Sequence, residues 1–306
     1  MTHTQYTGRY APSPTGPLHF GSLVAAVASY LDARTNQGRW LLRMEDLDKP
    51  REMPGAADDI LRTLEAYGFE WDGEVLFQSQ RGEIYQATLD QLIAENKVYR
   101  CNCSRREVAD IAHAGIEGPV YPGLCRNGLS RERETIAWRF KTDVEHLLFN
   151  DRIQGQIDHA MRRDIGDFIL KRADGQFAYQ LAVVVDDAEQ QINHVVRGAD
   201  LLNSTSRQIL LQYSLHLHSP VYAHIPIVTN AEGEKLSKQT HAQALQPGNA
   251  SRMLTQALAF LGLNPPTELA QYTLKEIWHW AGEHWQLVKV PCQNQLNSGQ
   301  QDGKID

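Results

Sequence analysis

The sequence of 306 residues lacks any apolar run long enough to cross a lipid bilayer. Its most apolar early run, residues 23–31, is too short for a membrane-spanning helix, and no cationic, apolar leader precedes it. Excess positive charge is also lacking: the formal net charge is -7, so no general field attracts the chain to nucleic acids or anionic membranes. These absences predict a cytoplasmic protein without a membrane partner, in which any contact with nucleic acid depends on a local basic patch.

Several common catalytic motifs are missing too. The sequence has no GxxxxGK(S/T), GxGxxG, HExxH or GxSxG pattern, which excludes these routes to phosphate binding, dinucleotide binding, zinc proteolysis and serine hydrolysis. Cysteine is scarce, with four residues, and the tight pair Cys101 and Cys103 is more typical of a metal site than of a disulfide framework. The 42% hydrophobic content suffices for a sizeable core and more than one domain.

The apolar patterns predict an α/β protein. Ser22 is placed to cap a helix that begins at Leu23, and a short strand follows from residue 39 to a carboxylate pair, Glu45 and Asp46. An order of strand, helix and strand favours a parallel sheet. Helical spacing recurs later, and β-branched runs predict two further strands. The helices are expected at 55–68, 82–97, 200–217, 253–261 and 274–281, the strands at 177–187 and 192–198, and a polar tail from Gln293.

Two loops carry residues suited to nucleotide chemistry. The pattern PxPxGxxHxG, from Pro12 to Gly21, precedes a helix N-terminus, where backbone N–H groups and the helix dipole attract phosphate. The second loop contains KLSK, from Lys235 to Lys238, whose lysines are suited to neutralising charge as pyrophosphate leaves a nucleotide. Taken singly, the first pattern is more typical of an ordinary Pro/Gly turn with a surface histidine, and the second of a solvated lysine pair.

A segment rich in cysteine and glycine predicts a metal site. Cys101, Cys103 and Cys125 supply three thiolates in a region with little periodicity, where a closed tetrahedral zinc site contributes folding energy in place of a core. A fourth ligand is required. From the chemistry of the side chains alone, His113 and Cys292 are the candidates, because tyrosine binds zinc poorly at its normal pKa.

Together, HFGS and KLSKQ resemble the HIGH and KMSKS signatures of class I aminoacyl-tRNA synthetases. Further segments are similar, in matching order across residues 8–240, to the glutamyl and glutaminyl branch of that class: GRYAPSPTGPLHFGS, LLRMEDLDKPR, WDGEVLFQSQR and VVVDDAEQQINHVVRGADLLNSTSRQ. Two positions depart from the signatures, Ser22 in the first and Gln239 in the second. The resemblance implies a Rossmann-like catalytic domain with a parallel sheet and a zinc-containing insertion.

The resemblance also implies roles for individual residues. His19, Gly21 and Lys238 would contact ATP, with His19 and Lys238 catalytic and Lys235 a weaker candidate. Asp186 and Asp187, which could be mistaken for a metal-binding pair, are expected to serve structure or capping. Tyr121, in the pattern YxxxC, would be the fourth zinc ligand. The implied glutamate-binding residues are Arg9, Tyr10, Ala11, Pro12, Ser13, Glu45, Tyr179 and Arg197.

The length after the second signature bears on the substrate. Only 68 residues follow Lys238, which is too short for the anticodon-binding domain of a full glutamyl-tRNA synthetase. The chain therefore resembles the shortened glutamyl-Q tRNA(Asp) synthetase family, which activates glutamate with ATP and Mg²⁺ without tRNA and then esterifies it to the cyclopentenediol of queuosine in tRNA(Asp). Two alternatives are a short glutamyl-tRNA synthetase that charges the 3′ end of tRNA(Glu) and a non-enzymatic, zinc-dependent RNA-binding module.

The expected organisation is a monomer with three parts. Residues 1–97 and 179–240 form the Rossmann-like catalytic domain, residues 98–178 form the inserted subdomain with the predicted zinc site, and residues 241–306 form a short helical region and polar tail. A local basic face is expected to contact the tRNA. Its members are Arg105, Arg106, Arg126, Arg131 and Arg133.

Overall fold

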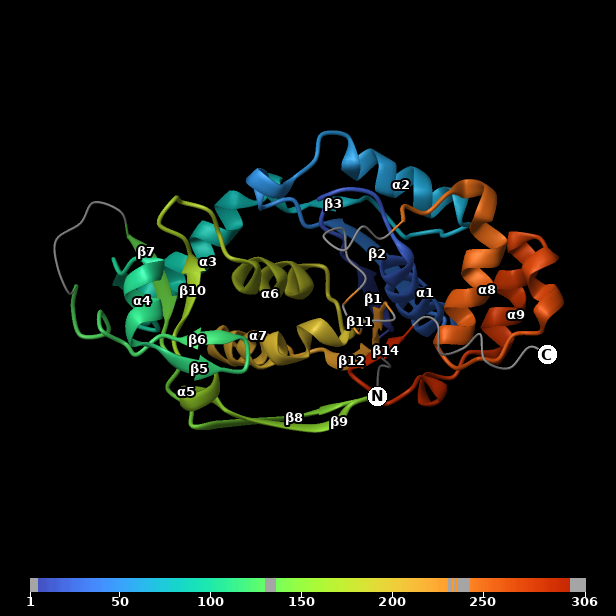
Figure 1. Ribbon diagram of the computed structural model, residues 1–306. Coiled ribbons are helices and arrows are strands. Elements are labelled where there is room, and N and C mark those ends of the chain that lie inside the picture. The colour runs from blue at the N-terminus through green and yellow to red at the C-terminus, as the bar shows by residue number, and fades with distance from the viewer. Residues whose placement is uncertain (1–4, 130–135, 231–232, 234, 236–242, 298–306) are drawn as a thin grey trace.

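A computed structural model describes residues 5–129, 136–230, 233, 235 and 243–297, and its centre is a parallel sheet (Figure 1). Strand β1 (Thr7–Tyr10) pairs in parallel with β2 (Arg39–Met44), which pairs in parallel with β3 (Leu76–Phe77). Strand β11 (His194–Gly198) pairs in parallel with β12 (Val221–Ile225) and lies beside β1, where the Asn193 N–H donates to the Thr7 carbonyl at 3.1 Å. The predicted parallel α/β sheet is confirmed.

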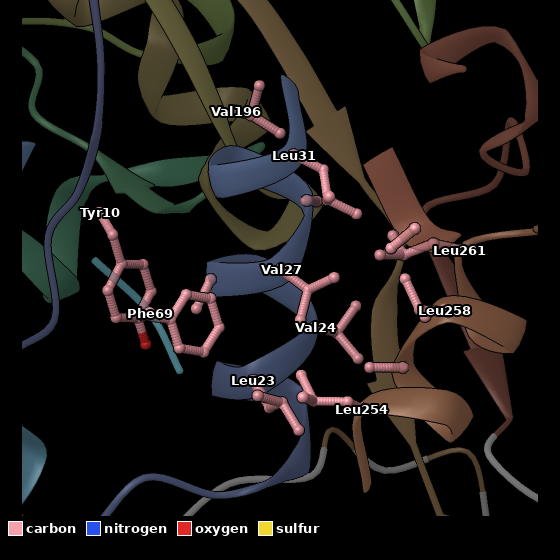
Figure 2. Close-up of a cluster of buried hydrophobic side chains, with 14 of the residues drawn as sticks. Tyr10, Leu23, Val24, Val27, Leu31, Phe69, Val196, Leu254, Leu258 and Leu261 are labelled. Carbon is pink, nitrogen blue, oxygen red and sulfur yellow. The ribbon is translucent and has the colours of Figure 1, made fainter. Parts of the chain in front are cut away.

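Helix α1 (Phe20–Thr35) lies between this sheet and two C-terminal helices, α8 (Ala250–Phe260) and α9 (Leu274–His284). Figure 2 shows Val24 and Val27 of α1 facing Leu254 and Leu258, while Leu31 lies near Val196 of the sheet. Burial of each such side chain contributes about 1.5–3 kcal/mol relative to exposure. Because α1 is covered on both sides, its sequence is apolar nearly all round.

The strand expected at residues 177–187 is wrong. This segment forms helix α6 (Tyr179–Glu189), in which every residue from Leu181 to Asp187 is buried. A helix covered on all sides has no polar face, so its apolar run has no 3.6-residue period that would distinguish it from a buried strand. Its three consecutive valines added a β propensity that packing overrides. The helix lies beside α3 (Gly82–Ala94) and α7 (Leu202–Ser214), as the Tyr85 hydroxyl donates to Asp186 at 2.8 Å.

Between α3 and α6 the chain forms a separate group of antiparallel strands, drawn in green in Figure 1. Strands β4 (Val98–Cys101), β7 (Ala137–Phe140) and β10 (Phe168–Lys171) make one small sheet with β7 in the middle. Two hairpins and two short helices complete the group. They are β5 (His113–Gly115) with β6 (Gly118–Val120), β8 (His146–Asp151) with β9 (Gly155–Ala160), α4 (Arg105–Ile111) and α5 (Met161–Asp164).

A buried carboxylate on α1 joins distant parts of the chain. Asp32, 2% exposed, accepts hydrogen bonds from the Tyr6 hydroxyl at 2.6 Å, from Arg152 Nη1 at 2.9 Å and from Trp285 Nε1 at 3.3 Å. These donors come from the segment before β1, the turn between β8 and β9, and the chain after α9. The C-terminal segment is therefore tied to the sheet by a polar contact as well as by the apolar core.

The predicted polar tail begins with a strand, β14 (Gln295–Asn297), which pairs in parallel with β13 (Ile227–Thr229). The remaining α-helix is α2 (Ala56–Ala66). No helix within the described ranges is long and apolar enough to cross a membrane. The short 3-10 helices are η1 (Lys49–Arg51), η2 (Gln78–Gln80), η3 (Ala199–Leu201), η5 (Pro247–Asn249), η6 (Thr267–Gln271) and η7 (Leu287–Lys289).

Candidate active site

A cleft of about 710 Å³ opens at the carboxyl ends of β1, β2 and β11. Clefts at these strand ends are where α/β sheets usually bind ligands. All eight residues expected to bind glutamate line the cleft, as do His19 and Lys235. Gly21 does not line it, although its neighbour Ser22 does, and Lys238 lies outside the described residues. The lining residues are Arg9, Tyr10, Ala11, Pro12, Ser13, Thr15, Leu18, His19, Ser22, Ala25, Glu45, Arg51, Tyr179, Val196, Arg197, Gly198, Leu201 and Lys235.

Arg9 is held from one side by a buried aspartate. Its Nε lies 3.1 Å and its Nη2 3.4 Å from the two carboxylate oxygens of Asp187, and Asp187 also binds Arg43 Nη2 at 2.5 Å. Burial alone would raise the pKa of Asp187, but the positive charges of Arg9 and Arg43 outweigh it and hold that pKa below its usual value. Asp187, an expected structural residue, thus fixes one edge of the Arg9 guanidinium at the wall of the cleft.

Glu45 is a nearly buried carboxylate, with 12% of its side chain exposed. Its Oε1 is buried without a hydrogen-bond partner, and the nearest cation, Arg43 Nε, is 4.0 Å away. Burial raises the pKa of Glu45 to about 7, against the opposing effects of Arg43 and Arg9. A buried acceptor without a hydrogen bond costs free energy, so this oxygen favours a ligand that donates hydrogen bonds, such as an ammonium group.

Arg197 is the last residue but one of β11 and is 5% exposed. Its Nη1 donates to the Tyr179 hydroxyl at 3.2 Å, which brings together two of the residues expected to bind glutamate. Its Nη2 donates to Thr205 Oγ1 and to Gln208 Oε1, each at 2.8 Å, and its Nε donates to a ring nitrogen of His224 at 3.0 Å. The guanidinium is therefore held in one orientation at the wall of the cleft.

The loop before α1 forms the other end of the cleft. His19 is the N-cap of α1, and its Nδ1 accepts the Ser22 N–H at 3.4 Å. The expectation that Ser22 caps this helix is wrong, because the helix begins at Phe20 and Ser22 lies within its first turn. Beside this turn the Tyr10 hydroxyl donates to the Ser22 carbonyl at 3.2 Å. The histidine thus stands at the positive end of a buried helix, as phosphate binding requires.

The first residue of KLSK, Lys235, and the segment that follows the motif, from Ala244, both lie near this loop. Lys235 donates to Asp200 at 2.6 Å and forms an isolated bridge with Thr229. After the signature, Ala244 forms an antiparallel bridge with His19, and the Leu245 N–H donates to the Leu18 carbonyl at 2.9 Å. The flanks of the two signatures therefore meet at one cleft, although 217 residues separate Leu18 from Lys235 in the sequence.

The three predicted thiol ligands cluster in the antiparallel group. The Sγ atoms of Cys101, Cys103 and Cys125 lie within 4.8 Å of one another, with Cys103 and Cys125 3.6 Å apart. Neighbouring sulfurs of a tetrahedral zinc site lie about 3.8 Å apart, given Zn–S bonds of about 2.3 Å. The Tyr121 hydroxyl is 3.4 Å from Cys101 Sγ and 3.3 Å from Cys103 Sγ. Four donor atoms thus converge at distances that fit zinc.

A buried arginine supports this cluster, and the alternative ligands lie apart from it. Arg139 Nε donates to Cys101 Sγ at 3.2 Å, and its guanidinium carbon lies 3.9 Å from the centre of the Tyr121 ring. His113 instead bonds the Arg163 carbonyl at 2.7 Å, and Cys292 is an exposed thiol. Of the candidate fourth ligands, only the Tyr121 hydroxyl is placed beside the thiol cluster in the described part of the chain.

The expected basic face is only partly described. Arg105 and Arg106 are exposed on α4, whereas Arg131 and Arg133 lie outside the described residues. Arg126 is paired with Asp143 and lies 3.5 Å from Asp167, so its charge is partly balanced within the fold.

Comparisons with known proteins agree with this geometry. The family model "tRNA synthetases class I (E and Q), catalytic domain" matches residues 5–281. The chain belongs to this class I synthetase family. A protein of Dechloromonas aromatica named glutamyl-Q tRNA(Asp) synthetase is 58% identical over 294 residues, covering 95% of this chain and 98% of the relative. One of the same name from Chromobacterium violaceum is 56% identical, covering 95% and 97%.

A solved structure shares the architecture of this synthetase. The crystal structure of glutamate-tRNA synthetase from Elizabethkingia anophelis superimposes with a TM-score of 0.78 at 25% identity, over 96% of this chain and 68% of that one. As a class I synthetase, the chain is a ligase that uses ATP, and the wall of its cleft provides cationic and anionic groups for an amino acid.

Sequence reasoning missed several residues that shape the synthetase site. Asp187 holds Arg9 and is itself bound by Arg43, and Asp151 and His224 lie behind Arg197. Arg43 is fully buried in β2, where every residue from Trp40 to Met44 is buried, so a charged residue within an apolar strand was the one available signal. The other partners are distant in sequence and carry no local pattern.

Proposed function

We propose that the chain activates L-glutamate with ATP to form glutamyl-adenylate, without tRNA, and then transfers glutamate to the cyclopentenediol of queuosine in the anticodon of tRNA(Asp). The observation that carries the first half is the opposition of Arg9 and Arg197 to the unpartnered carboxylate oxygen of Glu45 in one cleft. The second half is supported by the printed name of relatives more than half identical over nearly their whole length.

The cleft matches glutamate group by group. The α-ammonium group binds the buried Oε1 of Glu45, which otherwise has no hydrogen-bond partner. Arg9 and Arg197 bind the carboxylates, since a guanidinium offers paired N–H groups to an acidic side chain. The hydroxyl of Tyr179 and the segment Tyr10–Ser13, with Ala11 and Pro12 between, form the remaining wall.

ATP, as its Mg²⁺ complex, occupies the end of the cleft beside α1. His19, Gly21 and Lys238 contact it, with Lys235 near the same loop. The glutamate α-carboxylate attacks the α-phosphorus in line, a P–O bond forms and the bond to pyrophosphate breaks. His19, the α1 N-terminus and Lys238 stabilise the charge that develops on the phosphates, so positioning and electrostatics suffice without a side-chain nucleophile.

In the second step, a hydroxyl of the queuosine cyclopentenediol attacks the carbonyl carbon of the adenylate. An ester forms, AMP leaves, and the hydroxyl proton passes to solvent or phosphate. The antiparallel group, with Arg105, Arg106 and Arg126 on its surface, contacts the anticodon loop of the tRNA. Charge removal at these arginines should weaken tRNA binding without affecting glutamate activation.

One zinc ion, bound by Cys101, Cys103, Tyr121 and Cys125, stabilises that antiparallel group and takes no part in the chemistry. We further propose that residues 98–178 act as an inserted subdomain, that residues 1–97 and 179–240 form the catalytic domain, and that residues 241–306 form a short helical region and polar tail. The synthetase works as a monomer in the cytoplasm, where its four cysteines stay reduced.

Two measurements test the proposal separately. Exchange of labelled pyrophosphate into ATP should require glutamate and proceed without tRNA; exchange without glutamate, or none at all, would exclude glutamate activation. The second assay offers labelled glutamate and ATP with tRNA(Asp) that carries queuosine, with the same tRNA lacking it, and with tRNA(Glu). Label should reach only the first tRNA and, after nuclease digestion, should be found in the fragment that carries queuosine and not in the 3′-terminal fragment. Label on the 3′ end of tRNA(Glu) would instead identify a short glutamyl-tRNA synthetase.

A further inference from the structure

The Arg197 guanidinium is held by more partners than a binding residue needs. Four of its five N–H groups donate to the His224 ring, Thr205, Gln208 and the Tyr179 hydroxyl, and the Leu201 carbonyl lies 3.4 Å from Nη2. Within the described part of the chain, one Nη1 N–H is left for a ligand in the cleft. The direction of that N–H depends on the acceptor at Nε, because a guanidinium is planar and turns as a unit.

The acceptor at Nε is a histidine whose tautomer is set by a buried aspartate. His224 Nδ1 lies 2.6 Å from Asp151 Oδ2, and both side chains are fully buried. A carboxylate only accepts, so the proton is on Nδ1 and the lone pair of Nε2 receives the Arg197 Nε–H. Burial lowers the pKa of His224 to about 4, although Asp151 opposes this, so the ring remains neutral.

Asp151 is itself fixed by its other oxygen. Its Oδ1 accepts the backbone N–H groups of Ile153, Gln154 and His224 at 3.0, 2.9 and 3.1 Å. Because those donors occupy Oδ1, Oδ2 alone faces the histidine. Asp151 ends β8 in the antiparallel group, whereas His224 is on β12 and Arg197 on β11.

From this geometry we propose that Asp151 and His224 are positioning residues for glutamate binding: Asp151 selects the His224 tautomer, and that tautomer orients Arg197 toward the substrate carboxylate. The inference rests on the proposed function, in which Arg197 binds glutamate. It assigns the end of the β8–β9 hairpin a role in the amino-acid pocket, which it does not itself line.

The substitution Asp151→Asn tests the tautomer directly. Only the amide oxygen can accept the three backbone N–H groups, so the NH₂ group must face His224 Nδ1 and force the proton onto Nε2. Nε2–H then opposes the Arg197 Nε–H and finds only the Thr205 hydroxyl, 3.2 Å away. Loss of a charge-assisted hydrogen bond should raise the KM for glutamate about tenfold or more in tRNA-free pyrophosphate exchange. The KM for ATP should change less than twofold.

Two variants at His224 separate its contact with Asp151 from its contact with Arg197. His224→Gln keeps an acceptor where Nε2 lies, while His224→Asn keeps a donor toward Asp151 and loses the acceptor for Arg197. We expect the glutamine variant to retain a KM for glutamate near that of the wild type and the asparagine variant to resemble Asp151→Asn. The matched control is His159→Gln, a buried histidine on β9 that bonds Ser206 at 2.7 Å and does not contact Arg197.

Three results would overturn the inference. One is a KM for glutamate in Asp151→Asn that matches the wild type in folded protein; another is equal effects of the two His224 variants. The third is a nitrogen NMR spectrum of the wild type that places the His224 proton on Nε2. This measurement needs no variant, so it remains possible even if the substituted proteins do not fold. In an Arg197→Lys background, Asp151→Asn should add little further loss. If the wild type lacks glutamate-dependent exchange, the proposed function fails, whatever the tautomer proves to be.

Discussion

Replacing Glu45 by glutamine should make the ligand-free protein more stable while removing its activity. The ionised carboxylate is buried with one oxygen unpartnered, and burial raises its pKa from an ordinary 4.5 to about 7. Folding therefore favours the protonated form, and the stability present at low pH is lost as the pH rises through 7. A pKa rise of this size corresponds to about 3 kcal/mol. The neutral amide of Glu45→Gln avoids that cost.

The expected stability difference depends on pH. At pH 5 most of the folded protein carries a protonated Glu45, so the variant should gain only about 1 kcal/mol, and at pH 8 about 3 kcal/mol. Urea unfolding of both proteins at pH 5 and pH 8, without ligands, measures this change. Glu65→Gln, on the exposed side of α2, is the control, and its stability should differ from that of the wild type by the same small amount at both pH values.

The activity of the wild type should rise with pH over the range in which its stability falls. Bound glutamate brings its ammonium group to Glu45, so wild-type kcat/KM for glutamate should rise toward pH 7 and then level off. Glu45→Gln should show weak exchange without that rise. A variant no more stable than the wild type at pH 8, or one whose gain is the same at both pH values, would refute the reasoning.

Three further changes test other parts of the site. Asp187→Asn leaves Arg9 and Arg43 buried without their shared anion and should destabilise the protein by about 3–5 kcal/mol in urea unfolding; a loss below 1 kcal/mol would contradict the pairing. Cys125→Ser should reduce bound zinc, measured by elemental analysis, from one per chain toward zero, whereas Cys292→Ser at the exposed thiol should keep it. His19→Ala should lower kcat of pyrophosphate exchange by about tenfold to a hundredfold, with the glutamate KM little changed; an unchanged kcat would remove His19 from the chemistry.

Sequence patterns located the residues of the cleft but not the buried partners that hold their side chains in place. A helix from Leu23 and a strand from residue 39 were predicted because their apolar patterns are long or end in clear polar residues, although the helix begins three residues earlier, at Phe20. The resemblance to class I synthetases implied a shared site for Arg9, Glu45 and His19, and the structure places all three in one cleft at the carboxyl ends of parallel strands. These features depend on neighbours close in sequence.

The contacts that hold the arginines of the cleft could not be predicted, because their partners are distant in the sequence. Asp151 and His224 are 73 residues apart, and Arg9 and Asp187 are 178 apart, so no local period relates them. Helix α6 was mistaken for a strand because burial on all sides removed the 3.6-residue period of its apolar residues. As a result, the contact that Asp187 makes with Arg9 from the last turn of this helix was not foreseen. Tertiary packing supplied the information that the sequence pattern lacked.

The contacts of Asp32 have a consequence for how the chain folds during synthesis. Asp32 belongs to the first helix, yet one of its donors, Trp285, lies 253 residues further along. A buried carboxylate with a missing donor is less stable, and β13 also gains β14 only from residues near the end. A ribosome must therefore release almost the whole chain before this core can close. Nascent chains arrested before residue 285 should remain sensitive to protease and depend on chaperones, even though the cleft residues have already been made.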